Sequence, residues 1–483
     1  MSSGLELIGW VFVLTAGQAG VGAALIGQSS MPIRGAIPRA ALAWTLGSGL
    51  HTLVLFLISA VGAPLSAPLI LASAVLPAVV ALVMRRPWPI PAAHLWPSRF
   101  LRQIRVPELC VGGMLLALIA FQLVSLLGAD LVGRPDDWDE VAIWAVKGEA
   151  IYDEQSINGA RWGAWQDYPL HVPLLIATLE PGERRTGRLV AWLCAAATSS
   201  LMIGMMESRR GRLLAYAAAL LLLAAPVYEA QARLIFANVP FALYVLLGFW
   251  ALYGAPRRRH WSLAGIALGT AAWTRAEGIL LVSVLALPAL LVDARKHRGA
   301  ITRFVVLLSL FVVPWHVYQR WLSPFPPSPS TQFSPIFAEL MQGHFPTAST
   351  FGEVLAFAYA SLLSPSGQWG LTWWIIFGCL GVFLFIPPLW RRMGASSLAL
   401  SGYLVATLGM YAVVPQTMMP LSWWLQTGFD RVLLGIVPAA LIWSAAFVNL
   451  SQRRALAVWL SRGRMMEFRR QKSSSSRAVP LAQ

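Results

Sequence analysis

Long apolar stretches separated by short polar connections are the main pattern of this 483-residue chain. Each stretch approaches the roughly 20 residues that an α-helix needs to cross about 30 Å of hydrocarbon. A helix also satisfies its own backbone hydrogen bonds, as the bilayer core requires. The pattern predicts an all-α polytopic membrane protein with thirteen transmembrane helices, near residues 5–27, 40–61, 66–84, 108–129, 189–206, 213–228, 238–254, 261–275, 277–292, 302–320, 369–389, 397–414 and 430–449.

Composition supports this fold class and excludes a soluble globule. Hydrophobic residues make up 57% of the chain and charged residues only 12%, which is too little polar surface to cover a soluble domain. The three cysteines, Cys110, Cys194 and Cys379, all fall inside apolar stretches. We therefore expect neither a disulfide framework nor a thiolate metal site.

Charge divides the polar connections into two sets, because Lys and Arg beside a span resist translocation. One set of alternate connections holds 27 Lys and Arg with 4 Asp and Glu, against 10 and 17 in the other. This predicts an integral protein, of the bacterial inner membrane, with its N-terminus outside and its C-terminus in the cytoplasm. The net charge of +16 then reflects a basic rim facing anionic lipid, and no nucleic-acid partner is expected.

The longest acidic segment lies in the outer connection over residues 130–170. Asp136, Asp137, Asp139 and Glu140 fall within five residues. Such carboxylates repel one another unless they share a cation, a proton or a substrate. We therefore expect the chemistry of the protein in this segment.

A short surface helix is predicted over residues 138–152. Val141, Trp144, Ala145 and Gly148 recur there at helical spacing, which suits a helix lying on the outer leaflet. Asp139 and Glu140 would occupy its first turn, beside the positive end of the helix dipole. A carboxylate held there stays ionised and can accept a proton from a substrate hydroxyl or amine.

Four elements follow in order on the predicted outer side. They are Asp139-Glu140 after a span, Asp167-Tyr168-Pro169-Leu170-His171-Val172-Pro173, Thr274-Arg275-Ala276-Glu277-Gly278, and Asp430-Arg431 with Pro438. Together they resemble the GT-C superfamily of membrane glycosyltransferases, such as the protein O-mannosyltransferases and the lipid A aminoarabinose transferases. The resemblance covers roughly residues 108–450 and leaves the first three spans as an addition.

The resemblance implies transfer of a sugar from a polyprenyl-phosphate donor to a lipid, glycan or protein acceptor, with inversion at the anomeric carbon. It assigns Asp139 as the base, with Glu140, Asp136 and Asp137 as rivals. Arginine suits the departing phosphate because its guanidinium is permanently charged and bidentate. We place Arg431 there first, then Arg275, with Arg320 less favoured and Lys147 as a further candidate. Tyr168, His171, Asn238 and Glu277 are predicted to bind acceptor or substrate.

One position departs from the family pattern. Members often carry Asp before Pro in the outer connection that here reads Phe236-Ala237-Asn238-Val239-Pro240. Because an amide cannot act as a base, Asn238 is expected only to form hydrogen bonds with a substrate or a metal.

Several alternatives stay open. The acids could simply cap the helix, and the arginines could reach lipid headgroups. The acids also offer oxygen ligands for Mg or Mn, although no metal is required. A transporter would place its charges at mid-membrane, and a polysaccharide polymerase or ligase would share this topology. The pattern also divides the chain into five parts. Residues 1–106 are additional helices, 107–322 the core, 323–368 a Pro-rich outer loop, 369–450 the last helices and 451–483 a basic cytoplasmic tail.

Overall fold

The computed structural model describes residues 4–26, 33, 35–84, 106–132, 137–166, 168–179, 186–206, 208–254, 259–323, 346–414 and 419–452. Every regular element in these ranges is a helix, which confirms the all-α prediction. The basic tail beyond residue 452 and most of the Pro-rich loop, residues 324–345, lie outside them.

Each of the thirteen apolar stretches contains a helix, but not all of these helices are long enough to cross a membrane. Five helices are long and apolar enough to cross a membrane, or seven if each of two bent helix pairs counts as one span. The five are α1 (Gly4–Ile26), α2 (Ala36–Ala60), α5 (Val106–Val132), α14 (Arg298–Val317) with its continuation to Leu322, and α18 (Pro387–Ala412). The count of thirteen spans is therefore not confirmed.

Shorter helices account for the difference. Those from α11 (Asn238–Tyr253) to α13 (Gly278–Asp293), with α12 (Trp261–Ala272) between them, have 12 to 16 residues. At 1.5 Å per residue they fall short of about 30 Å. In addition, α9 (Arg209–Leu223) meets α10 (Pro226–Ala232) at a 72° bend.

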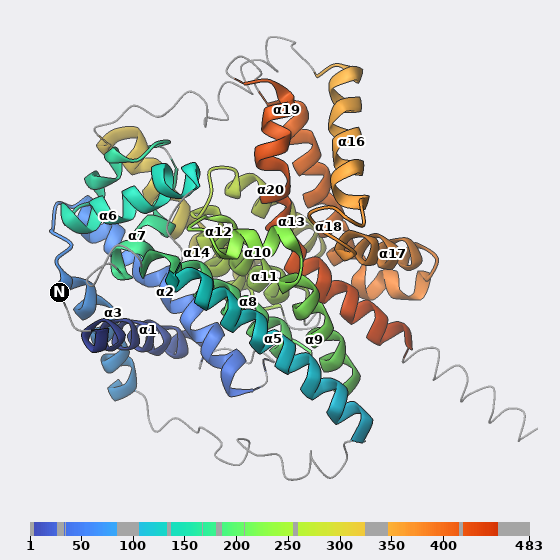
Figure 1. The fold of residues 1–483 in the computed structure, drawn as a ribbon, viewed down its shortest axis with the longest axis horizontal. Helices are drawn as coiled ribbons and strands as arrows, with labels where there is room; N and C mark the ends of the chain where they lie inside the picture. Colours follow the sequence, from blue (N-terminus) through green and yellow to red (C-terminus); the bar gives the residue numbers. More distant parts are fainter. Residues whose placement is uncertain are drawn as a thin grey trace, which may run out of the picture.

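The N-terminal helices form a layer at one edge of the molecule (Figure 1). In this layer α1 packs against α2 and α3 (Ala67–Met84). A Cβ on Gly22 would come within 1.8 Å of the Ala43 carbonyl oxygen, so only glycine permits this crossing of α1 and α2. On its other side α2 contacts α7 (His171–Leu179) and α8 (Leu189–Gly204), which ties the layer to the rest of the fold.

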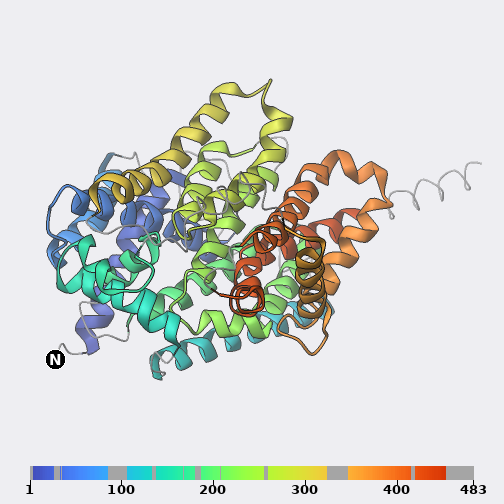
Figure 2. The same cartoon turned by 90° about the horizontal axis from the view of Figure 1, so that it is seen from above.

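Helix α11 occupies the centre of the fold and is buried along nearly its whole length. It contacts α8, α12, α13 and α20 (Asp430–Leu434). Such all-round burial explains why its sequence is apolar on every face. The helices of the C-terminal part pack on the side of α11 away from α1 and α3 (Figures 1 and 2).

The acidic segment folds as a π-helical turn, η2 (Glu140–Ala145), that continues into α6 (Val146–Asp153). A helix is therefore present where one was predicted. It does not lie freely on a surface, because it packs against α7 and the 3-10 helix η3 (Ile157–Trp162). The π turn also shifts the helical register, so that Ile143 is buried with Trp144 while Val141 is 39% exposed.

The C-terminal part contains α16 (Ala348–Leu363), α17 (Thr372–Leu384) and α18, then α19 (Leu421–Trp424), η6 (Leu425–Phe429) and α20. Residues 323–368 were predicted as a Pro-rich outer loop, and α16 forms a regular helix within that range. Asp430 joins it to α20, because its Oδ1 accepts hydrogen bonds from Ser361 Oγ at 2.5 Å and Trp369 Nε1 at 2.7 Å.

Candidate active site

A cavity of about 450 Å³ lies between the acidic segment and the α18–α20 region. Its charged and amide side chains come from four separate parts of the chain. They are Asp137, Asp139, Asn238, Arg275, Glu277 and Arg431. The remaining lining is largely aromatic and apolar, so the cavity pairs a few convergent polar groups with an apolar surface, as binding sites for organic ligands do.

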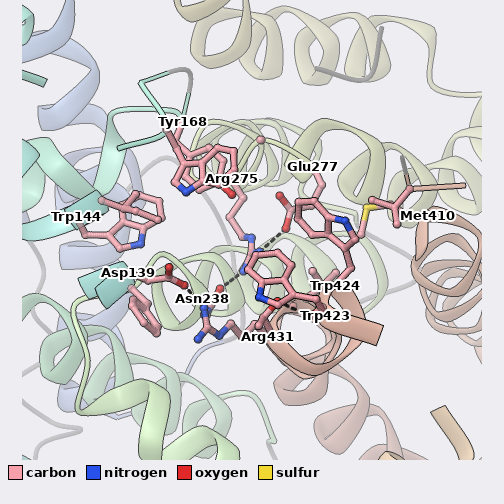
Figure 3. Close-up of a pocket in the computed structure, with 18 of the residues that line it drawn as sticks. Asp139, Trp144, Tyr168, Asn238, Arg275, Glu277, Met410, Trp423, Trp424 and Arg431 are labelled. Atoms are coloured by element: carbon pink, nitrogen blue, oxygen red, sulfur yellow. Dashed lines mark hydrogen bonds and ion pairs between the residues drawn. The ribbon is translucent and has the colours of Figure 1, made fainter. Parts of the chain in front are cut away.

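Asp139 and Arg431 form an ion pair across this cavity (Figure 3). Asp139 lies immediately before η2, and Arg431 is the second residue of α20. Both side chains remain partly exposed, at 31% and 27%. The guanidinium of Arg431 lies 4.8 Å from the centre of the Phe236 ring, where a cation is attracted by the ring. The backbone N–H of Asp139 donates to Asp137 Oδ1 at 2.9 Å, which holds both carboxylates at the cavity.

A second ion pair lies beside the first, between Arg275 and Glu277 at 2.5 Å (Figure 3). Both residues occupy the short connection between α12 and α13. Burial disfavours the charge of Arg275, but Glu277 more than offsets it, so the pKa of Arg275 is raised and the guanidinium stays charged. Arg275 Nη1 also donates to Asn238 Oδ1, and Asn238 Nδ2 donates to Gln231 Oε1. The hydrogen bonds that Asn238 forms here are therefore with protein groups, and its expected contact with a substrate or a metal stays a prediction.

The structure places Glu140 away from the cavity, unlike the rival base expected from the sequence. It is fully buried, and Arg188 Nε and Nη2 each donate to one of its oxygens at 3.0 Å. The backbone N–H of Ile235 donates to the same carboxylate at 3.1 Å. Glu140 therefore joins the acidic segment to the start of α8 and to the connection before α11. Its side chain points away from that of Asp139 because successive residues of a helix lie about 100° apart around its axis.

Lys147 and His171 also need correction, since neither lines the cavity. Lys147 is fully buried, and its ammonium donates to the Trp165 carbonyl, so it does not reach a donor phosphate directly. His171 is fully buried, with Nδ1 2.8 Å from Thr52 Oγ1. Burial lowers the pKa of His171 to about 3, so its imidazole is neutral at physiological pH.

The other predicted residues divide as follows. Tyr168 lines the cavity with Asn238 and Glu277, and their role in binding substrate stays a prediction. Arg320, in the π-helical turn η5 (Tyr318–Leu322), is not among the lining residues. Asp136 lies outside the described residues. Within those residues, no group of three or more His, Cys, Asp and Glu side chains is arranged to hold a metal ion.

Sequence reasoning missed the partner of Glu140 and the aromatic lining. Arg188 closely follows Arg184 and Arg185, so no signal in the sequence singled it out as the partner of Glu140. Trp423 and Trp424 come eight and seven residues before Arg431, about two helical turns, which could have placed them near the same site.

Residues 174–318 match the model of the dolichyl-phosphate-mannose-protein mannosyltransferase family. The resemblance predicted from the sequence is confirmed over this stretch. It indicates a membrane glycosyltransferase of the GT-C type. The matched stretch includes Asn238, Arg275 and Glu277, while Asp139 and Arg431 lie on either side of it. The chain matches no curated protein and no solved structure.

Proposed function

We propose that the protein transfers a sugar from a polyprenyl-phosphate donor to a lipid, glycan or protein acceptor at the outer face of a bacterial inner membrane. One observation is the main support for this proposal. The carboxylate expected as the base and the arginine expected at the donor phosphate meet in one cavity, although they come from opposite ends of the family-like region.

The residues of the cavity supply the two functions that an inverting displacement needs. Asp139 accepts the proton of the acceptor O–H or N–H, whose oxygen or nitrogen then bonds to the anomeric carbon. The bond between that carbon and the phosphate oxygen breaks, and the phosphate leaves with the electron pair. Arg431 and Arg275 stabilise the negative charge that grows on the phosphate in the transition state.

The two ion pairs suggest the order in which donor binding and proton transfer take place. Asp139 is bound to Arg431 and Glu277 to Arg275, so neither arginine is uncompensated in the cavity. A donor phosphate would compete with Asp139 for Arg431. A carboxylate released from its cation is a stronger base. Donor binding would therefore prepare Asp139 to receive the acceptor proton.

The position of the cavity agrees with an outer-face site. Arg275 follows the C-terminal end of α12, whereas Arg259, two residues before α12, pairs with Asp293 at 3.2 Å at the opposite end of the α12–α13 pair. The connections at that opposite end carry the basic residues expected in the cytoplasm, including Arg295 and Lys296. The cavity thus lies at the helix ends away from them.

The proposal is tested with purified protein in lipid vesicles that contain a polyprenyl-phosphate sugar. Candidate sugars come from glycan and glycolipid profiling of a deletion strain, because the missing sugar identifies donor and acceptor together. Wild-type protein should transfer the sugar and release polyprenyl phosphate, and Asp139→Asn should not. If instead a solute crossed the vesicle membrane only when the protein was present, and no sugar were transferred, a transporter would replace this proposal.

A further inference from the structure

Three aromatic side chains form one continuous surface of the cavity. We call Trp144, Trp165 and Tyr168 the aromatic wall. The centre of the Tyr168 ring lies 5.7 Å from that of Trp144 and 6.2 Å from that of Trp165, to which it is nearly parallel, at 18°. All three line the cavity. Such ring separations are those of stacked aromatic groups, so the wall is a preformed surface.

The backbone of Trp165 is held in a conformation that side chains other than glycine rarely adopt. Its φ is +52°, in the left-handed region. For a residue of this size that conformation costs on the order of 1 to 3 kcal/mol and persists only where its surroundings enforce it. Strain of this kind concentrates at ligand-binding positions. The orientation of Trp165 is therefore a feature that the surrounding structure maintains.

Lys147 is one of the groups that hold Trp165 in this conformation. Its buried ammonium donates to the Trp165 carbonyl and lies 5.7 Å from the centre of the Tyr168 ring. The neighbouring backbone is fixed as well, because the N–H of Ala164 donates to the Ala142 carbonyl at 2.7 Å. At Gly163, a Cβ would meet the Lys147 side chain at 2.5 Å, so the backbone segment leading to Trp165 packs directly against the lysine.

The opposite side of the cavity combines two tryptophans with a methionine and a valine. We call Met410, Val414, Trp423 and Trp424 the apolar wall. Met410 belongs to α18, one of the helices long and apolar enough to cross a membrane. In Figure 3 Arg275 and Arg431 lie between Trp144 and Tyr168 on one side and Met410 and Trp424 on the other, with Asp139 next to Trp144. The cavity therefore runs from an aromatic surface, past two cations, to a surface continuous with a membrane helix.

We propose that the sugar of the donor stacks on the aromatic wall, with its phosphate between the two arginines and its polyprenyl chain along the apolar wall. This assignment rests on the proposed function and adds to it the direction in which the donor lies. The C–H face of a sugar ring packs against Trp and Tyr rings, while their N–H and O–H groups remain available to its hydroxyls. The orientation also places the anomeric carbon beside Asp139. Lys147 acts as a positioning residue, through Trp165.

The test compares two probes with chains of the same length, polyprenyl phosphate and polyprenyl-phosphate-mannose, by binding to the full-length protein in detergent. Trp165→Ala should weaken binding of the mannose conjugate about tenfold and leave binding of the sugar-free lipid unchanged. Trp165→Phe, which keeps an aromatic ring, should weaken binding of the mannose conjugate less than Trp165→Ala does. Trp424→Ala should weaken binding of both probes. Equal weakening of both probes by Trp165→Ala would mean that the aromatic wall contacts the lipid, which would overturn the assignment.

Lys147→Met tests the positioning role, since methionine fills similar space without the ammonium. It should reduce the preference for the mannose conjugate over polyprenyl phosphate, as Trp165→Ala does, and Gly163→Ala should do so too by displacing the lysine. A loss of thermal stability with an unchanged preference would give Lys147 a structural role only and would remove it from the proposal.

Two outcomes separate the inference from the function on which it rests. If the wild-type protein binds neither probe, the proposed function fails. If it binds both equally while transferring the sugar, the function stands and the sugar-binding role of the aromatic wall is overturned.

Discussion

Arg431 and Asp139 lie 292 residues apart in the sequence and form an ion pair across the cavity. The pair joins the acidic segment before η2 to the beginning of the last long helical region. Because each side chain is about one-third exposed or less, the interaction is open to a ligand yet partly shielded from solvent. We propose that the function of this site depends on the pair.

Asp139→Asn should reduce sugar transfer by at least about 100-fold, since general-base catalysis contributes that much or more. The asparagine cannot take the acceptor proton, but it no longer competes for Arg431. Donor affinity should consequently stay equal or increase. The measurements are single-turnover transfer and donor binding in detergent.

Asp137→Asn provides the matched control for that experiment, because it makes the same chemical change two residues away in the same cavity. It should reduce transfer far less. A result in which Asp137→Asn abolished transfer and Asp139→Asn did not would reassign the base to Asp137.

Arg431→Gln should raise the KM for the donor about 10- to 100-fold, the range expected from losing hydrogen bonds between charged groups. The KM of Arg431→Lys should lie between those of the wild type and Arg431→Gln, because lysine keeps the charge without the bidentate geometry. Arg320→Gln serves as the control, since Arg320 is absent from the cavity lining. An equal rise of KM in Arg320→Gln would show that the donor contacts η5 as well.

Arg188→Met should lower the free energy of unfolding by about 3 to 5 kcal/mol, because it leaves the buried Glu140 carboxylate without its cation. Thermal unfolding in detergent measures the change. The double variant Arg188→Met/Glu140→Gln should recover part of the stability. Should Glu140→Gln instead abolish transfer with an unchanged melting temperature, Glu140 would be a catalytic group rather than a structural one.

Acidification should destabilise the protein through His171. Its pKa is lowered to about 3 in the folded state, against the ordinary value of 6.5, so between these values the unfolded chain binds more protons. Its contribution to the free energy of unfolding is present above pH 6.5 and falls by about 2 kcal/mol between pH 7 and pH 5. His171→Asn should show a correspondingly smaller loss of thermal stability over this range. The same pH dependence in both proteins would exclude His171 as the cause.

The sequence by itself determined the membrane-protein class and the positions of the long helices, and it selected several residues that line the cavity, Asp139, Arg275 and Arg431 among them. Hydrophobic stretches fix helices because burial in hydrocarbon demands internal backbone hydrogen bonds, a local property of each stretch. Asp139 and Arg431 could be selected because charges beside apolar stretches are rare and costly.

Only the tertiary structure decided how these groups meet. The carboxylates of Asp139 and Glu140 are adjacent in the sequence, yet in the fold they pair with different arginines, Arg431 and Arg188. The sequence pattern also did not predict that Lys147 is buried. The aromatic wall likewise depends on a strained backbone at Trp165. Pairings across hundreds of residues follow from packing, and packing is a property of the whole fold rather than of any local pattern.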